Sequence, residues 1–440
     1  MDLAGLQEGG YRIPLLLMAF LIGLGTALYH LGIRLAAPFV PKAQLWVDGR
    51  QGSWARLDAK SAALHGCLWM HCASVGEFEQ GRPVLEAIKR ERPDLPVLLT
   101  FFSPSGYEAR KNFPLATHVE YLPPDSAANA ERLLNLVRPK AAIFIKYEFW
   151  YQHLAALERG GVPTFLVSAI FRPSQPFFRW YGAAHRTMLK CFTHLFVQDT
   201  ASRDLLNGIG VQHVIVSGDT RFDRVMAIIE KDETIPLAHS FREAGTTPVL
   251  IAGSTWPADE AILRTAFNGS SGNLRLVFVP HELTTAHLEE LAGRFDKIAT
   301  WSELEDADTP LLEGKNDRSV SAAPALLVDR MGLLSKLYKY ADITYVGGGF
   351  GSGIHNTLEA AAWGKPVIFG PNHQRFAEAQ GLIDAGAGFS VKDAEELSSL
   401  LKRFLNDPVA LQNASKAASR YVTEHTGATK RVVRAVLAVL

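Results

Sequence analysis

The chain has 440 residues, with 45 basic and 45 acidic side chains and therefore no formal net charge. This length exceeds what one hydrophobic core usually holds and predicts two domains, while 48% hydrophobic and 20% charged residues are typical of a globular protein. Zero net charge argues against binding bulk nucleic acid, which needs a basic field to displace counterions, so no nucleic-acid partner is expected.

The N-terminal stretch "IPLLLMAFLIGLGTALYHLGI" (13–33) holds no formally charged side chain and is long enough to cross a bilayer. The segment after it carries more basic residues than the segment before it. Residues 1–35 are therefore predicted to form a single-pass membrane anchor with the bulk of the chain on the cytoplasmic side. A cleaved signal peptide processed near "LAAP" and a helix lying on the membrane surface are the alternatives.

After a predicted linker at 36–65, apolar stretches alternate with helical stretches over 66–222, which indicates a parallel α/β sheet. Helices are expected in "FEQGRPVLEAIKRER", near 126–137 and near 151–159. Strands are expected in "GCLWMHCASVGEFE", "LPVLLTFFS", "HVEYLP", "AAIFIKYEFW", "VPTFLVSA", "HLFVQD" and "HVIVSGD".

The alternation pauses at 223–246, a predicted interdomain linker, and resumes over 247–425 with "TPVLIAGST", "LRLVFVPHE", "ALLVDRMG", "ADITYVGGG" and "KPVIFGP". Two doubly wound halves are expected to leave a cleft at the carboxyl ends of their strands, where open α/β sheets bind ligands. Residues 426–440 are predicted to form an apolar helix that can return to pack on the first half.

Three cysteines, Cys67, Cys72 and Cys191, cannot all pair with one another and match no zinc spacing. Buried thiols in a reducing compartment are therefore expected. The sequence also contains no H-x-x-x-H, no paired-aspartate motif and no G-x-S-x-G. Neither a metal site nor a serine hydrolase is predicted.

Five glycines lie within 347–353, in "ADITYVGGGFGSGIHNTLEAAAWGKPVIFGP". They fail the dinucleotide pattern G-x-G-x-x-G at its last position. Glycine N–H groups and the start of the following helix nevertheless suit an anion. Glu359, expected one turn beyond His355, can accept two ribose hydroxyls. A tight turn with a helix cap is the simpler alternative.

In "HCASVGEFE", Gly76 is expected to give a tight strand-to-helix turn that presents Glu77 at the mouth of the cleft. A general base needs such a position beside an acceptor hydroxyl. Two other interpretations stay open, because a carboxylate at a helix N-terminus is a common stabiliser and because Glu79 competes for the same role.

Polar and cationic side chains follow other predicted strands. They are Lys146 and Glu148 in "IKYEFW", Arg172 in "SAIFR", Arg221 in "GDTRFDR", Ser254 and Thr255 in "AGSTWPADE", and His281 in "VPHE". Converging cations suit an acidic sugar or a phosphate. Taken singly, each cation fits a surface ion pair and His281 fits a structural role.

Over almost its whole length the chain resembles the bacterial 3-deoxy-D-manno-octulosonic acid (Kdo) transferases of lipid A assembly, glycosyltransferase family 30, most closely in their Bacteroidetes form. The resemblance rests on an N-terminal anchor followed in order by "ASVGE", "YEFW", "GDTRFDR" and "GGGFGSGIHNTLEAAAWGKPVIFGP". It implies a GT-B fold of two Rossmann-like doubly wound domains facing a cleft. It also implies inverting transfer, without metal or cofactor, from CMP-Kdo to the tetraacylated lipid A precursor (lipid IVA) at the inner membrane.

The resemblance further implies that Glu77 is the general base and that Glu359, in "HNxLE", contacts the CMP ribose. The donor-binding residues it implies are Ser254, Thr255, Pro280, His281, Met331, Gly332, Gly349, Gly351, Gly353, Asn356 and Glu359, with the three glycines lining the phosphate. The acceptor or sugar-carboxylate residues it implies are Ser74, Gly76, Lys146, Glu148, Arg172 and Arg221, of which Glu148 matches the acid of "E-x-W".

Three departures from the family pattern bear on these roles. Lys146 stands where many members have an acidic residue, and Pro280 directly precedes His281 where many have an arginine. Leu333 replaces a glutamate that is common in the "M-G-E-L" segment, which leaves only backbone contacts from Met331 and Gly332.

An acylated acceptor stays in the bilayer, so basic and apolar residues near the anchor are expected to approach membrane lipids. The candidate segment is "RPSQPFFRWYG" (172–182), with an ordinary loop packed on the core as the alternative. Two other functions remain open: another GT-B nucleotide-sugar enzyme, such as an epimerase or a different transferase, and a catalytically silent membrane scaffold.

Overall fold

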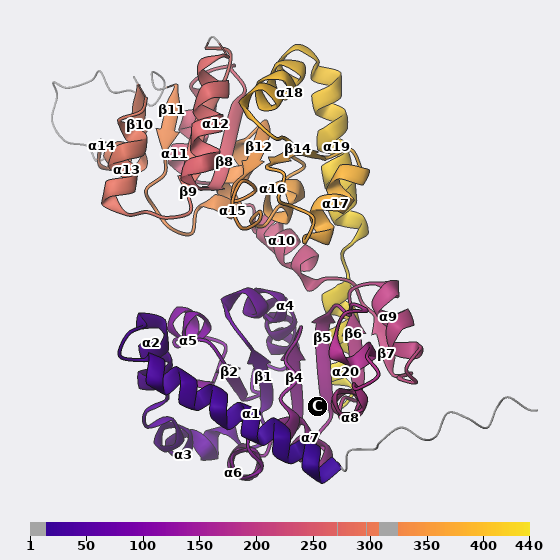
Figure 1. The fold of residues 1–440 in the computed structure, drawn as a ribbon. Helices are drawn as coiled ribbons and strands as arrows, with labels where there is room; N and C mark the ends of the chain where they lie inside the picture. Colours follow the sequence, from indigo (N-terminus) through magenta and orange to yellow (C-terminus); the bar gives the residue numbers. More distant parts are fainter. Residues whose placement is uncertain (1–14, 271, 296, 308–323) are drawn as a thin grey trace, which may run out of the picture. The chain divides into compact units, whose positions relative to one another are not determined.

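The computed structural model describes residues 15–270, 272–295, 297–307 and 324–440. The chain divides into two compact units, Met1–Arg224 together with Thr426–Leu440, and Val225–His425. Each unit contains a seven-stranded parallel sheet with helices packed on it (Figure 1). The predicted α/β class with two parallel sheets is therefore confirmed.

The sheet of the first unit has the strand order β3-β2-β1-β4-β5-β6-β7. Its strands are β1 Leu68–Cys72, β2 Val97–Phe101, β3 His118–Tyr121, β4 Ala141–Ile145, β5 Thr164–Ala169, β6 His194–Val197 and β7 Val214–Val216. The central strands are buried throughout, as expected of parallel strands that helices cover on both faces. The helices and turns among them are α4 Val75–Glu91, α5 Pro104–Arg110, α6 Ala127–Val137, α7 Tyr151–Arg159, η1 Pro176–Phe178, α8 Ala183–Lys190 and α9 Thr200–Asn207.

Three helices precede this sheet: α1 Leu15–Ala36, α2 Pro41–Arg50 and α3 Ser53–Leu64. The structure thus forms helices within 36–65, where the sequence predicts a linker, and buries Trp46 and Leu57 there. Among the described residues, no helix combines the length and hydropathy that crossing a bilayer requires. The predicted anchor at 1–35 falls partly on residues 1–14, which lie outside the described ranges.

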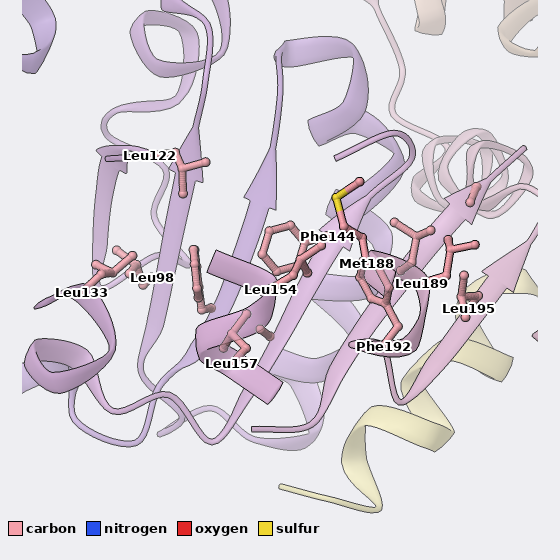
Figure 2. Close-up of a cluster of buried hydrophobic side chains, with 14 of the residues drawn as sticks. Leu98, Leu122, Leu133, Phe144, Leu154, Leu157, Met188, Leu189, Phe192 and Leu195 are labelled. Atoms are coloured by element: carbon pink, nitrogen blue, oxygen red, sulfur yellow. The ribbon is translucent and has the colours of Figure 1, made fainter. Parts of the chain in front are cut away.

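The core of the first unit lies on both faces of its sheet. Figure 2 shows part of one face, where Phe144 of β4 packs among Leu154 and Leu157 of α7 and Phe192. On the other face, Val432 and Val436 of α20 (Ala428–Leu437) pack with the buried side of α4. The C-terminal helix therefore belongs to the first unit, although the second unit precedes it in the chain.

The second unit begins within α10 (Thr220–Lys231), and its sheet has the order β10-β11-β9-β8-β12-β13-β14. Its strands are β8 Val249–Thr255, β9 Arg275–Pro280, β10 Ile298–Thr300, β11 Ala325–Leu327, β12 Ile343–Val346, β13 Val367–Phe369 and β14 Gly388–Ser390. Its helices and turns are α11 Pro236–Glu243, α12 Pro257–Asn268, α13 Thr285–Ala292, α14 Trp301–Ala307, α15 Leu334–Leu337, η2 Tyr338–Tyr340, α16 Leu358–Ala362, α17 Ala377–Asp384, α18 Ala394–Asn406 and α19 Pro408–Glu424. The predicted linker at 223–246 is largely helical, formed by α10 and α11.

Candidate active site

Glu77 lies in the first turn of α4, directly beyond the carboxyl end of β1. Ser74 caps this helix: its Oγ accepts a hydrogen bond from the Gly76 N–H at 3.2 Å, and its hydroxyl donates to Oε2 of Glu77. The positive end of the helix dipole favours a negative charge at this place. Glu77 is half-buried, and its Oε1 has no hydrogen-bond partner in the part of the chain that the structure describes. One oxygen is thus held while the other is available to a ligand.

Glu79, the competing carboxylate, is committed to arginines. Its oxygens lie 2.9 Å from Arg110, 3.2 Å from Arg224 and 3.8 Å from Arg82. Burial by itself works to raise the pKa of Glu79, but the Arg110 hydrogen bond and the charges of Arg224 and Arg82 together lower it below the ordinary value. A carboxylate with a lowered pKa is a poor proton acceptor, so the geometry favours Glu77 as the base.

Glu148 lies beyond the carboxyl end of β4, next to β1, and only 9% of its surface is exposed. Its Oε2 receives hydrogen bonds from Nε1 of Trp150 at 2.7 Å and lies 2.9 Å from Nε2 of His71. The other ring nitrogen of His71 lies 2.9 Å from Oγ1 of Thr100. Glu148 is therefore built into a buried polar cluster and is not a surface acid.

Both predicted carboxylates are placed at the carboxyl end of β1, because Glu77 follows that strand in α4 and Glu148 is hydrogen-bonded to His71 within the strand. Burial raises the pKa of Cys72, the last residue of β1, well above its ordinary value, and the charges of Glu77, Glu148 and Glu79 raise it further. Cys67 is buried and Cys191 is half-buried, and all three thiols are free. The sheet edge thus brings the predicted base and the second predicted carboxylate together.

The predicted cations of this unit differ in their partners. Arg221 is ion-paired with Asp219, with Nη2 2.7 Å from Oδ2. Lys146 and Arg172, after the neighbouring strands β4 and β5, form no ion pair among the described residues. Burial raises the pKa of Tyr147, and the charge of Arg172 opposes that shift. Lys146 and Arg172 are therefore the cations best placed to meet an anionic ligand.

Three side chains of this cluster, His71, Thr100 and Trp150, are not among the residues predicted from the sequence. In the sequence, His71 and Thr100 look like ordinary buried strand residues. Of the three, only Trp150 belongs to one of the family motifs, "YEFW". Tyr147 is also not among the predicted residues. The charge of Glu77 raises its pKa, and the charge of Arg172 lowers it.

Left-handed backbone angles occur at the carboxyl ends of strands in both units. The φ angle is 68° at Lys146, 56° at Ser168 and 53° at Ser254, and the strand pairing shifts register near the last two. Such bulges are common beside active sites, where they redirect side chains. The predicted residues Lys146 and Ser254 therefore lie in irregular backbone at the binding edges of their sheets.

In the second unit, the glycine loop follows β12 and packs closely against the end of β8. A Cβ on Gly347 would lie 2.3 Å from the carbonyl oxygen of Ser254, and one on Gly349 would lie 2.6 Å from the backbone of Gly370. No side chain fits at these distances. Close backbone packing therefore requires glycine here independently of any ligand.

Most of the glycine N–H groups of this loop already have acceptors within the second unit. Gly351 and Gly353 both donate to the carbonyl oxygen of Gly348, at 3.0 and 3.2 Å, and Gly347 donates to Gly253. The Gly348 N–H donates to Oδ2 of Asp259 at 2.9 Å. Gly349 is the remaining predicted glycine, and its N–H has no acceptor within the described ranges.

Asp259 fixes this loop from inside the unit, with 1% of its surface exposed. Its Oδ1 accepts from the hydroxyl of Tyr345 at 2.7 Å, and its Oδ2 accepts from the N–H groups of Trp256 and Gly348. Asp259 is not among the residues predicted from the sequence. Its spacing within "TWPADE" resembles an ordinary helix-start acid.

Three rings stack beside the loop. The ring centres of Trp256 and His281 are 4.8 Å apart, and those of His281 and His355 are 4.3 Å apart. The indole of Trp256 donates to Nε2 of His355 at 3.0 Å, so the proton of a neutral His355 ring sits on Nδ1. Burial lowers the pKa of His355, and the neighbouring His281 lowers it further. The structure thus brings the predicted His281 to the glycine loop.

The predicted helix geometry at 355–359 is wrong in one respect. Helix α16 begins at Leu358 and has five residues, so His355 precedes it and does not share a helical face with Glu359. Asn356 also precedes this helix, and its side chain accepts from the Leu358 N–H and donates to Oε1 of Glu359 at 3.0 Å. Burial raises the pKa of Tyr338, and the charge of Glu359 raises it further, which places Glu359 near that buried ring.

The other predicted donor residues have less distinctive positions. The Thr255 hydroxyl donates to Glu260 at 3.0 Å and is buried, and Pro280 is the buried last residue of β9. Met331 is 79% exposed, and Gly332 adopts a φ of 82° with open space around it. Among the described residues, no three histidine, cysteine or acidic side chains are grouped so that they could hold a metal ion.

The fold resembles that of solved nucleotide-sugar enzymes. The UDP-GlcNAc 2-epimerase of Neisseria meningitidis bound to UDP-GlcNAc aligns with a TM-score of 0.58 at 15% identity, over 84% of this chain and 99% of that one. At this identity the likeness shows the fold alone, and it supports the GT-B class of two parallel-sheet domains.

Sequence comparison shows the family. The model of the family described as 3-Deoxy-D-manno-octulosonic-acid transferase (kdotransferase) matches residues 48–224. The 3-deoxy-D-manno-octulosonic acid transferase of Aquifex aeolicus (strain VF5) is 30% identical over 349 residues, 78% of this chain and 86% of that protein. The one of Bordetella pertussis is 28% identical over 94% of this chain and 99% of its own length. The chain therefore belongs to the 3-deoxy-D-manno-octulosonic acid transferases, a family of glycosyltransferases.

Proposed function

We propose that this protein transfers Kdo from CMP-Kdo to the lipid A precursor lipid IVA, with release of CMP, in lipopolysaccharide biosynthesis. The family supports the sugar and the reaction class. The observation that carries the proposal is the half-buried Glu77, held through one oxygen by Ser74 at the start of α4, at the sheet edge where Glu148 is hydrogen-bonded to His71.

In the proposed reaction, an acceptor hydroxyl attacks the anomeric carbon of Kdo while its proton passes to Glu77. The bond between that carbon and the phosphate oxygen breaks, and CMP leaves with the bonding electrons. A single displacement of this kind inverts the configuration at the anomeric carbon. Base assistance of this type contributes about 10²–10⁴-fold to a rate.

CMP-Kdo carries a phosphate and a sugar carboxylate, so its recognition needs positive partners. In the second unit, we assign the phosphate to the Gly349 N–H and the CMP ribose to Glu359. In the first unit, neither Lys146 nor Arg172 is ion-paired in the part of the chain that the structure describes, so we propose both as partners for an anionic group of the acceptor. Fixed N–H groups and cations can stabilise the departing phosphate, so we propose that transfer does not depend on a metal ion.

We also propose that the first unit attaches to the inner membrane, where an acylated acceptor resides. Helix α1 and the segment after it expose large apolar side chains: Leu28 59%, Leu31 51%, Leu35 67%, Phe39 86% and Leu45 51%. Arg34 and Lys42 lie in the same segment. Apolar and basic side chains together favour binding at an anionic lipid surface. Trp180, 92% exposed, and Tyr181 offer a second contact in the predicted 172–182 segment.

The test is incubation of the full chain with CMP-Kdo and lipid IVA, with products resolved by mass. The expected result is a lipid heavier by one or more Kdo units and an equal amount of CMP. Parallel reactions with a metal chelator and with a UDP-sugar donor test the other parts of the proposal. A lipid of unchanged mass, with CMP-Kdo intact, contradicts it.

A further inference from the structure

A line of hydrogen bonds runs through the interior of the first unit to Glu148. Nε1 of Trp69 lies 2.9 Å from Oγ1 of Thr100, and Oγ1 of Thr100 lies 2.9 Å from Nδ1 of His71. Nε2 of His71 lies 2.9 Å from Oε2 of Glu148, which Trp150 also contacts at 2.7 Å. Trp69, Thr100 and His71 have no exposed surface. Burying a polar group costs free energy unless it is hydrogen-bonded, and here each buried group is hydrogen-bonded to the next.

The chemistry of the groups fixes the direction of these bonds. An indole nitrogen can only donate, so the Thr100 oxygen accepts from Trp69. The Thr100 hydroxyl proton then has two candidate acceptors, Nδ1 of His71 at 2.9 Å and the Met70 carbonyl oxygen at 3.5 Å. The shorter bond is much the stronger. Nε2 of His71 faces the carboxylate of Glu148, which can only accept when ionised, so the proton of a neutral His71 ring sits on Nε2 and Thr100 donates to Nδ1.

With this tautomer, His71 donates to Oε2 of Glu148, and Trp150 donates to the same oxygen. The indole N–H of Trp150 also lies in donor geometry 3.0 Å from Nε2 of His71. An ionised carboxylate can only accept, so Nε2 carries the proton toward Glu148 and Trp150 donates to the nearer Oε2. Oε2 is thus doubly held. Oε1 of Glu148 has no hydrogen-bond partner among the described residues, and 11% of the side chain is exposed.

We infer that His71 is a positioning residue for the transfer reaction: Thr100 sets its tautomer, and His71 with Trp150 orients Glu148 so that its second oxygen accepts a hydrogen bond from a hydroxyl of the sugar acceptor. This inference rests on the function proposed above. Glu148 orients the acceptor beside Glu77, which takes the proton. Correct orientation of the acceptor hydroxyl raises the transfer rate, and residues that do not touch the substrate can change that orientation.

A purely structural cluster is the competing explanation, and two observations favour orientation. A chain of donors that all point one way ends on a carboxylate at the carboxyl edge of the sheet, where ligands bind. That carboxylate is also hydrogen-bonded to His71 of β1, the strand that Glu77 directly follows. A cluster that served packing alone would need neither a place at the carboxyl edge of the sheet nor a place beside the strand that leads to Glu77.

The experiment compares Thr100→Val, which keeps the shape but removes the hydroxyl, with Thr100→Ser, which keeps it, in the full chain. The matched control is Thr164→Val, another fully buried strand threonine, whose hydroxyl donates to the Val162 carbonyl oxygen at 2.9 Å at the opposite end of β5. The measurements are kcat, the KM for each substrate, thermal unfolding, and ¹⁵N chemical shifts of selectively labelled histidine.

For Thr100→Val we expect kcat to fall about ten-fold or more and the KM for CMP-Kdo to stay within about two-fold, because an unsatisfied buried group misplaces the carboxylate without touching the donor. Thr100→Ser should recover most of the rate. The wild-type His71 should show a protonated Nε2 and an unprotonated Nδ1, and Thr100→Val should disturb that pattern. Thr164→Val should lose stability without losing rate.

Equal kcat in Thr100→Val and the wild type, or a wild-type His71 protonated on Nδ1, overturns the inference while Kdo transfer stands. Equal rate losses in Thr100→Val and Thr164→Val overturn it too, because general destabilisation then explains both. If the wild type itself transfers no Kdo from CMP-Kdo, the proposed function fails, and the role of Glu148 at the acceptor fails with it.

Discussion

Nη2 of Arg110 lies 2.9 Å from Oε1 of Glu79, and this contact distinguishes Glu79 from Glu77, which precedes it by two residues in α4. Glu79 is surrounded by arginines, whereas Glu77 contacts the hydroxyl of Ser74. Glu79 therefore holds neighbouring arginines within its unit, whereas Glu77 keeps one oxygen available to a ligand. From the sequence, the Gly76 turn favours Glu77, and Glu79 stays open as a competitor.

Glu77→Gln should abolish proton removal from the acceptor while keeping the size of the side chain and an oxygen for Ser74. We expect transfer to fall about 10²-fold or more and CMP affinity to stay within a few-fold, because the change lies outside the second unit, to which we assign CMP binding. Steady-state transfer and CMP titration measure the two effects. Glu79→Gln is the matched control and should retain most of the rate. Near-normal turnover in Glu77→Gln rules out the base assignment.

Glu79 should make stability depend on pH. Its pKa in the folded protein lies below the ordinary 4.5, because the arginine contacts outweigh burial. Such a group stabilises the fold fully above the unfolded-state pKa, and this contribution is lost as pH falls through the folded-state value. The free energy of unfolding should therefore differ between wild type and Glu79→Gln by about 1 kcal/mol at neutral pH. Urea unfolding should show that difference shrinking in acid; a difference independent of pH contradicts the ion-pair account.

Gly347→Ala should disrupt the glycine loop at 347–353. The added Cβ would lie 2.3 Å from the Ser254 carbonyl oxygen and 2.7 Å from the Thr255 Cα, so strand β8 or the loop must shift. Overpacking of this kind costs about 1–3 kcal/mol. We expect a lower melting temperature and weakened CMP binding. Gly245→Ala is the control in the same unit, since its Cβ meets nothing closer than 3.9 Å. Similar losses in both variants count against this close approach.

Acidic substitutions at the end of α1 and in the segment after it should weaken membrane binding. In Leu35→Glu with Phe39→Glu, two highly exposed apolar side chains become anionic beside Arg34 and Lys42. We expect at least about ten-fold weaker binding to vesicles with anionic lipid, because apolar insertion and charge attraction are both reduced. Vesicle sedimentation of the full chain measures this. Val409→Glu, at an exposed apolar position of the second unit, should bind as the wild type does. Unchanged binding of the double variant shows that this surface is not the contact.

The sequence predicted much of the local structure because local patterns carry it. The apolar runs that became β1, β4, β8 and β12 are continuous, which is typical of strands covered on both faces. "SVGE" carried a turn, a helix cap and an acid within four residues, so Glu77 could be placed without its neighbours. The helices of 36–65 were missed because their apolar positions make a weak pattern, and packing on the sheet stabilises them.

What the sequence determined by itself is the series of parallel strands, the family motifs and the position of Glu77 just after a strand. What only the tertiary structure decided is which residues meet there. His71 and Glu148 lie 77 residues apart, and Asp259 and Gly348 lie 89 apart. Parallel strands need long crossover connections, so the residues that share a sheet edge are distant in the chain. Local spacing cannot encode such contacts. The arginines around Glu79, the tautomer of His71 and the internal use of the glycine N–H groups follow only from the folded chain.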